Sequence, residues 1–138
     1  MPLLSRKGVL AIAAVIDVAL NATMKPVSAK ALASRHGLPP RHLEPVLQAL
    51  VHDGILRGVR GPRGGYELGR SKREITADEI LRAAGTTDEA TDQHLPGSDL
   101  IARVVMPALS QAEQAFLTSL ATISLDDLVR RADGLLQA

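Results

Sequence analysis

Cysteine and tryptophan are absent from this chain of 138 residues, which also has a single tyrosine and a single phenylalanine. The lack of cysteine excludes disulfides, thiolate metal sites, iron–sulfur clusters held by cysteine, and cysteine nucleophiles. Aliphatic side chains must therefore fill the core, and a hydrophobic content of 46% is enough for them to do so. At this length we expect one domain, or one domain with an arm.

Long apolar runs are also missing. The stretch from Val9 to Leu20 is interrupted by Asp17, is shorter than a membrane span, and is not followed by a small-residue cleavage site. The sequence therefore predicts neither a membrane helix nor a signal peptide. We expect a cytoplasmic protein with no membrane partner.

No group of residues has the spacing of a catalytic or metal site. The four histidines are scattered along the chain, at His36, His42, His52 and His94. No glycine-rich loop follows a strand and opens a helix to hold phosphate. The sequence therefore predicts a protein that is not an enzyme and has no metal or cofactor.

The net charge of +1 hides an uneven distribution of charge. Residues 1–75 contain 12 of the 16 Lys and Arg residues and 5 of the 15 Asp and Glu residues, a net charge of +7, whereas residues 76–138 carry −6. A basic half favours a polyanionic partner such as nucleic acid. Because proteins without such a partner can show the same polarity, the charge supports this reading without deciding it.

Apolar spacing predicts three helices in the basic half. They run from about Ser5 to Asn21, from Ala29 to His36, and from Pro39-Pro40 to Asp53-Gly54. Ser28 is a good N-cap for the second helix, and Gly37 ends it. Two helices separated by a few residues that include a glycine are typical of a helix-turn-helix.

The third helix has one apolar face and one polar face. Its apolar face contains Leu43, Val46, Leu47, Leu50 and Val51, and its polar face presents Arg41, His42, Glu44, Pro45, Gln48 and His52. Glutamate can accept from cytosine N4, and arginine or glutamine can pair with purines in the major groove. Pro45 lacks an N–H, so we expect it to kink the helix or delay its start. An ordinary solvated face is the alternative.

A short hairpin rich in arginine and glycine follows. Gly61, Pro62, Gly64 and Gly65 supply turn chemistry, and we expect Val59, Tyr66 and Leu68 to face inward. The arginines Arg57, Arg60, Arg63 and Arg70 are left pointing outward. Such a loop suits a wing that follows a phosphate backbone and enters a minor groove, although alone it fits a solvated hairpin equally well. Directly after a helix-turn-helix, it predicts a winged helix-turn-helix.

The acidic half contains a short helix, Ala77 to Ala84, and then a long helix from Ser98. A helix of about 25 residues is nearly 40 Å long, which exceeds the body that it would cover. We therefore expect a homodimer, with a bend at Pro107; packing on the chain's own core is the alternative. The expected interface residues are Ile101, Val105, Leu109, Ala112, Phe116, Leu120 and Ile123. Ser124 can cap a last helix, Leu125 to Arg131.

Several short motifs together resemble a known family. They are Arg6-Lys7-Gly8, Pro26-Val27-Ser28, Leu43-Glu44, Gly54-Ile55-Leu56, Val59-Arg60-Gly61-Pro62 with Gly64-Gly65-Tyr66, Ile75-Thr76, and the run from Ile123 to Leu128. In this order, over nearly the whole chain, they resemble the bacterial winged-helix transcription regulators typified by IscR, NsrR and CymR. The resemblance implies a DNA-binding homodimer joined by crossed C-terminal helices, which reads a partly palindromic operator.

The resemblance also implies roles for single residues. The recognition helix would begin at Pro40, with Arg41, Glu44 and Pro45 where base-contacting side chains sit, and Arg60 would enter the minor groove. Pro45 departs from the pattern because it has no donor to offer a base. Cluster-binding members carry three cysteines in the segment that matches residues 86–97, and this chain has none. Iron–sulfur sensing therefore does not transfer, and the effector is left open as a small molecule, a protein partner, or none.

We therefore predict a mostly α fold with a small β-hairpin wing. Residues 1–85 form a winged helix-turn-helix DNA-binding domain, 86–97 a loop, and 98–138 a dimerisation helix with a short C-terminal helix. The predicted function is a sequence-specific DNA-binding transcription regulator, a repressor, that acts as a homodimer on double-stranded DNA. A winged-helix protein-interaction module and a small-ligand sensor with incidental DNA binding are the alternatives. The expected DNA-binding residues are Ser5, Arg6, Lys7, Ser28, Arg41, His42, Glu44, Pro45, Gln48, Arg57, Arg60, Arg63 and Arg70.

Overall fold

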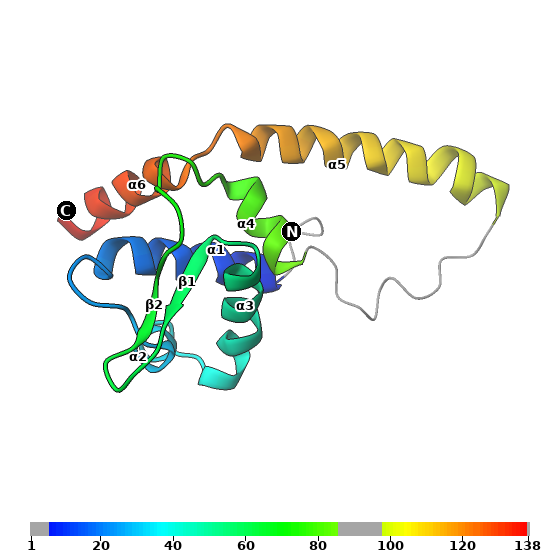
Figure 1. Cartoon of the computed structure of the whole chain (residues 1–138). Helices are drawn as coiled ribbons and strands as arrows, with labels where there is room; N and C mark the ends of the chain where they lie inside the picture. Colours follow the sequence, from blue (N-terminus) through cyan, green and yellow to red (C-terminus); the bar gives the residue numbers. More distant parts are fainter. Residues whose placement is uncertain (1–5, 86–97, 138) are drawn as a thin grey trace.

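The structure is a computed structural model that describes residues 6–85 and 98–137. Its elements are α1 (Arg6–Asn21), α2 (Ala29–Arg35), α3 (Pro40–His52), β1 (Leu56–Val59), β2 (Gly65–Leu68), α4 (Ala77–Ala84), a π-helical turn η1 (Ile101–Val105), α5 (Met106–Ala121) and α6 (Leu125–Gln137) (Figure 1). The predicted mostly α fold with one hairpin is confirmed. Ser5 and the predicted loop over 86–97 lie outside the described residues.

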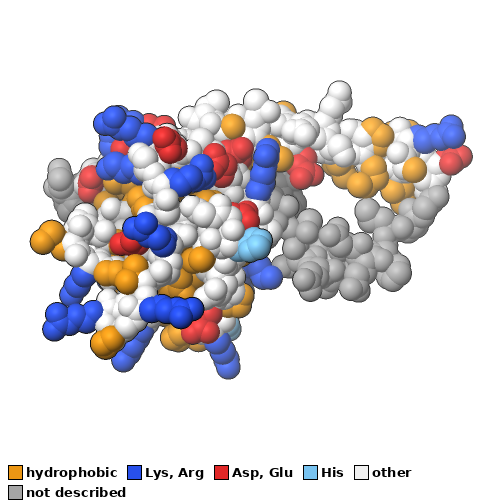
Figure 2. All heavy atoms as spheres, viewed as in Figure 1, with side chains coloured by type: hydrophobic (Ala, Val, Ile, Leu, Met, Phe, Trp, Pro, Cys, Tyr) orange, Lys and Arg blue, Asp and Glu red, His pale blue; other side chains and the backbone are white. Residues whose placement is uncertain are grey.

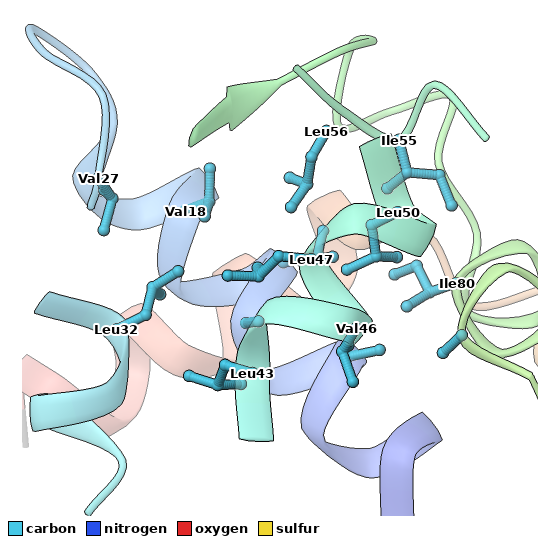
Figure 3. Close-up of a cluster of buried hydrophobic side chains, with 14 of the residues drawn as sticks. Val18, Val27, Leu32, Leu43, Val46, Leu47, Leu50, Ile55, Leu56 and Ile80 are labelled. Carbon is cyan, nitrogen blue, oxygen red and sulfur yellow. The ribbon is translucent and has the colours of Figure 1, made fainter. Parts of the chain in front are cut away.

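The core forms where α1 packs against α3, α4 and α6 (Figure 3). It is aliphatic, as the composition predicts, because the apolar residues of each helix recur at spacings of three and four and so share one face. Its largest fully buried side chains are Leu32, Leu43, Leu47, Leu50, Ile55, Leu56, Ile75, Ile80, Leu81, Leu125, Val15 and Val18. We call this part of the molecule, α1 to α4 with the hairpin and α6, the body.

Helix α3 begins at Pro40 and continues through Pro45. The delayed start expected from Pro45 is therefore not observed. Pro40 occupies the first turn, where a missing N–H costs nothing and the fixed φ suits a helix. Pro45 lies on the exposed face, so its ring does not enter the core.

The hairpin is antiparallel, with Leu56 opposite Leu68 and Val59 opposite Gly65. The chain just before α2 extends this small sheet, because Val27 and Tyr66 exchange two backbone hydrogen bonds of 2.9 and 2.7 Å. Tyr66 and Leu68 are partly buried, as expected. The expectation for Val59 is wrong, since this residue is the last of β1, where the strand leads into the wing tip, and is 36% exposed.

The C-terminal helix returns to the body. The N–H of Ala77 donates to the Ile123 carbonyl at 2.9 Å, and the N–H of Leu125 donates to the Ile75 carbonyl at 2.7 Å. Leu125 and Val129 then enter the same core as α1. Helix α6 starts where the sequence predicts and continues beyond the expected end, to Gln137.

Residues 99–121 are helical without a break, which confirms the predicted long helix. The π-helical turn ends two residues before Pro107, and the N–H of Met106 donates to the carbonyl of Ile101. A π turn is one way in which a helix accommodates a residue that has no N–H for the regular ladder. Neither η1 nor α5 has a buried residue. Within the described ranges, no helix is both long and apolar enough to cross a membrane.

Candidate nucleic-acid interface

The polar face of α3 is exposed to solvent. Its apolar residues point into the core, so the opposite side is left exposed; we call it the reading face. It consists of Arg41, His42, Glu44, Pro45, Gln48 and His52. In the described part of the chain, neither Arg41 nor Glu44 has an ion-pair partner, so both charged groups remain available to a ligand.

The hairpin lies beside α3. Two of its arginines form ion pairs within the described chain, and two do not. Arg57 forms an ion pair with Glu67, its neighbour across the strands, and Arg70 forms one with Glu79 of α4. Arg60 and Arg63 are exposed near the tip and have no acidic partner among the described residues. The uncompensated positive charge of the wing is therefore concentrated at its tip.

A buried carboxylate fixes α2 against α1. The Asp17 side chain is 6% exposed and accepts from Arg35 Nε at 2.9 Å and Nη2 at 2.6 Å, and from Asn21 Nδ2 at 3.0 Å. His36 Nε2 lies 3.0 Å from the same carboxylate. Burial raises the pKa of Asp17, but the hydrogen bonds from Arg35 and Asn21 and the nearby positive charge outweigh it, so the pKa lies below its ordinary value. The hydrogen bond to Asp17 raises the pKa of Arg35.

Sequence reasoning missed this network. The signal was present, because Asp17 is an acid within the apolar run of the first helix, and a buried acid requires partners. The sequence gives no indication that two of the partners, Arg35 and His36, lie 18 and 19 residues away, at the end of the second helix. The network matters for the interface because it sets how the helix-turn-helix is held on α1.

Not all the expected contact residues lie together. Ser28 caps α2 as predicted, its Oγ accepting from the Ala31 N–H at 3.1 Å, and it stands beside the wing. Arg6 and Lys7 are exposed at the start of α1, a helix of 16 residues, and are therefore about 24 Å from its other end. Figure 2 shows Lys and Arg projecting from the part of the body that holds the wing and α2.

A helix-turn-helix followed by an arginine-tipped hairpin defines a winged helix-turn-helix, a fold of DNA-binding transcription regulators. Residues 4–131 match the Rrf2 family, described as iron-dependent transcriptional regulators, and the chain belongs to this family. It is 33% identical to the HTH-type transcriptional regulator IscR of Photorhabdus laumondii over 137 residues, which cover 96% of this chain and 82% of that protein.

Solved structures give the same result. The fold is similar to that of T. potens IscR, with a TM-score of 0.73, 29% identity, and coverage of 94% of this chain and 87% of that one. It is also similar to CymR, the global cysteine regulator of B. subtilis, with a TM-score of 0.71, 26% identity, and coverage of 93% and 96%. The predicted resemblance, the winged-helix fold and the assignment as a DNA-binding transcription regulator are therefore confirmed. The family and these relatives are regulators and not enzymes.

Proposed function

We propose that the chain is a cytoplasmic repressor that binds a partly palindromic operator as a homodimer. The reading face of α3 enters the major groove, and the wing enters the neighbouring minor groove. The observation that carries this proposal is that Gln48 of the reading face and Arg60 of the wing line one hollow, and that Arg60 and Arg63 have no acidic partner in the described chain. Repression is the simplest output of operator occupancy, since it requires no contact with polymerase.

Two further observations support the dimer. No residue of η1 or α5 is buried in the single chain, and Leu109 is 56% exposed. Of the expected interface residues, Ile101, Phe116, Leu120 and Ile123 are partly buried, whereas Val105, Leu109 and Ala112 are exposed. A second copy would cover this face and set the distance between two recognition helices, as operators with two half-sites require.

The test begins with selection of bound fragments from the host genome, starting with DNA upstream of the gene itself. We expect an enriched inverted repeat, and a reporter behind it should be silenced. Glu44→Ala should then relax base preference at one position in each half-site by about 1–3 kcal/mol, because a carboxylate that accepts from cytosine N4 would be lost. An unchanged ranking of operator variants would show that this face of α3 does not read bases.

An iron–sulfur cluster does not fit this chain, although the family is described as iron-dependent. Thiolates hold such clusters, and the sequence has no cysteine. Within the described ranges, no group of three or more His, Asp or Glu residues could hold a metal ion. We therefore propose regulation without a cluster.

Protein purified in air should be colourless and should bind its operator with the same affinity after anaerobic treatment with iron, sulfide and reductant. Absorption spectra and binding titrations of the two preparations measure this directly. A stoichiometric cluster that also changes operator affinity would contradict the proposal.

A further inference from the structure

The wing is flanked by two hollows in the protein surface. On one side lies a hollow of about 420 Å³, which the wing shares with α3 and which is lined by Gln48, Val51, Arg60 and Tyr66 among others. On the other side lies a larger hollow of about 840 Å³, which the wing shares with the α1–α2 connection and α2. We call the larger one the far cleft, because it is on the side of the wing away from α3.

The far cleft is basic. Lys25, Arg35 and Arg63 line it, together with the Ser28 side chain and the tip residues Pro62 and Gly64. None of the described residues that line it is acidic. The charge of Arg35 is largely compensated by Asp17, whereas Lys25 and Arg63 have no acidic partner in the described chain. Two uncompensated cations therefore approach the same space from opposite walls.

The two walls are joined to one another. Val27, two residues from Lys25, pairs with Tyr66 through the two backbone hydrogen bonds already described. Gly65 permits this contact, because a Cβ there would lie 2.4 Å from the Val27 carbonyl oxygen. The wing tip and the α1–α2 connection are thus held at one separation, so the spacing between Lys25 and Arg63 is set by the fold.

We propose that the far cleft binds the phosphodiester backbone of the second DNA strand that borders the minor groove entered by the wing. A minor groove is only about 6 Å wide and is bounded by a strand on each side, so an element inserted between the strands has phosphates on both flanks. The hollow shared with α3 faces the strand that separates the major groove from this minor groove. The far cleft then faces the other strand, and Lys25, which sequence reasoning did not select, becomes a phosphate-binding residue.

This inference depends on the proposed function, and Lys25→Ala tests it separately. Measured on the selected operator at several salt concentrations, the variant should show a salt slope lower by about 0.9, the value for one lost phosphate contact on duplex DNA. The ranking of operator variants should stay unchanged, because phosphate contacts carry no sequence information directly. The double variant Lys25→Ala/Arg63→Ala should lower the slope by about two such contacts.

The matched control is Arg131→Ala, which removes one exposed positive charge from α6, away from the wing. It should leave the salt slope unchanged. Hydroxyl-radical footprints should also show that Lys25→Ala loses protection only on the far flank of the wing's minor groove.

Three results would overturn the inference. The first is an unchanged slope for Lys25→Ala on an operator that the wild-type protein still reads, which leaves the proposed function intact. The second is an equal loss for Arg131→Ala, which would show a general charge effect. The third is evidence that the cleft binds free anions and not DNA. Inorganic phosphate would then raise the thermal stability of the wild type but not of Lys25→Ala, and the salt slope of operator binding would be the same for both proteins. Failure of the wild type to select any sequence would instead reject the proposed function.

Discussion

The body and the long helix use their apolar residues in opposite ways. The body buries Leu43, Leu47 and Leu50 of α3 almost completely, against helices of the same chain. In the N-terminal half of the long helix, Leu100, Val104 and Leu109 are 66%, 58% and 56% exposed. Figure 1 shows this half extending past the body, and Figure 2 shows apolar side chains gathered on it.

This difference separates the stability of the folded chain from the stability of an assembly of two chains. The body closes its core within one chain, so its fold should persist in a monomer. The long helix leaves an apolar face uncovered, and exposed apolar patches of this kind mark interaction sites. If the proposed function holds, base reading depends on a part that we expect to fold alone, whereas binding to a two-part operator depends on a part that we expect to require a second copy.

The largest expected effect comes from placing a charge in the uncovered face. Leu109→Glu would bury a carboxylate without a partner in the dimer, so we expect a monomer with an intact body. Operator affinity should fall by about 100-fold or more, because linking two binding modules raises overall affinity by about 10²–10⁴. Sedimentation and binding titrations measure both effects.

The matched control for this variant is Gln114→Glu, which adds the same charge to an exposed residue on the opposite side of α5. It should remain dimeric and bind normally. A Leu109→Glu protein that still sediments as a dimer would place the interface elsewhere.

The next effect acts within the body, at the contact between the wing and the start of the helix-turn-helix. In Gly65→Ala the new Cβ would lie 2.4 Å from the Val27 oxygen, so the strand pairing must open. We expect a loss of unfolding free energy of about 1–3 kcal/mol, as for overpacking, together with weaker DNA binding and an unchanged dimer. Gly58→Ala is the control, because a Cβ there meets nothing within 4 Å. Equal denaturation midpoints for the two variants would show that this close approach is not a constraint.

An effect of the same size on stability, without the loss of strand pairing, is expected from the buried carboxylate. Asp17→Asn removes charge-assisted hydrogen bonds to Arg35, and we expect a loss of about 1–3 kcal/mol in unfolding free energy at neutral pH. Asp133→Asn, at an exposed position of α6, should lose little. Urea titrations at a series of pH values measure both variants.

The pH dependence of Asp17→Asn has a defined sign. The pKa of Asp17 in the folded state lies below its ordinary value, so its stabilising contribution is complete above the ordinary value and is lost as the pH falls through the folded value. The stability difference between wild type and Asp17→Asn should therefore shrink in acid. A constant difference across this range would mean that the ionised form contributes no extra stability.

The sequence predicts the parts of this molecule that depend on local rules. Apolar spacing, Ser28, Gly37 and the glycines of the hairpin place the helices and the wing close to where the structure has them. Contacts between distant segments are different, because local patterns do not say which elements meet. The partners of Asp17, the pairing of Val27 with Tyr66, and the joint position of Lys25 and Arg63 all depend on tertiary packing. The prediction that Val59 faces inward was wrong for the same reason, since its exposure depends on tertiary packing.

The most direct test of the account is the geometry of one complex: the mass of the protein bound to its selected operator, combined with a hydroxyl-radical footprint of that complex. We predict two chains for each operator and two protected regions related by a dyad, with centres about 34–36 Å apart or at a multiple of that spacing, because each chain offers one recognition helix to a half-site. One chain for each operator, or a single protected region at full occupancy, would contradict the account.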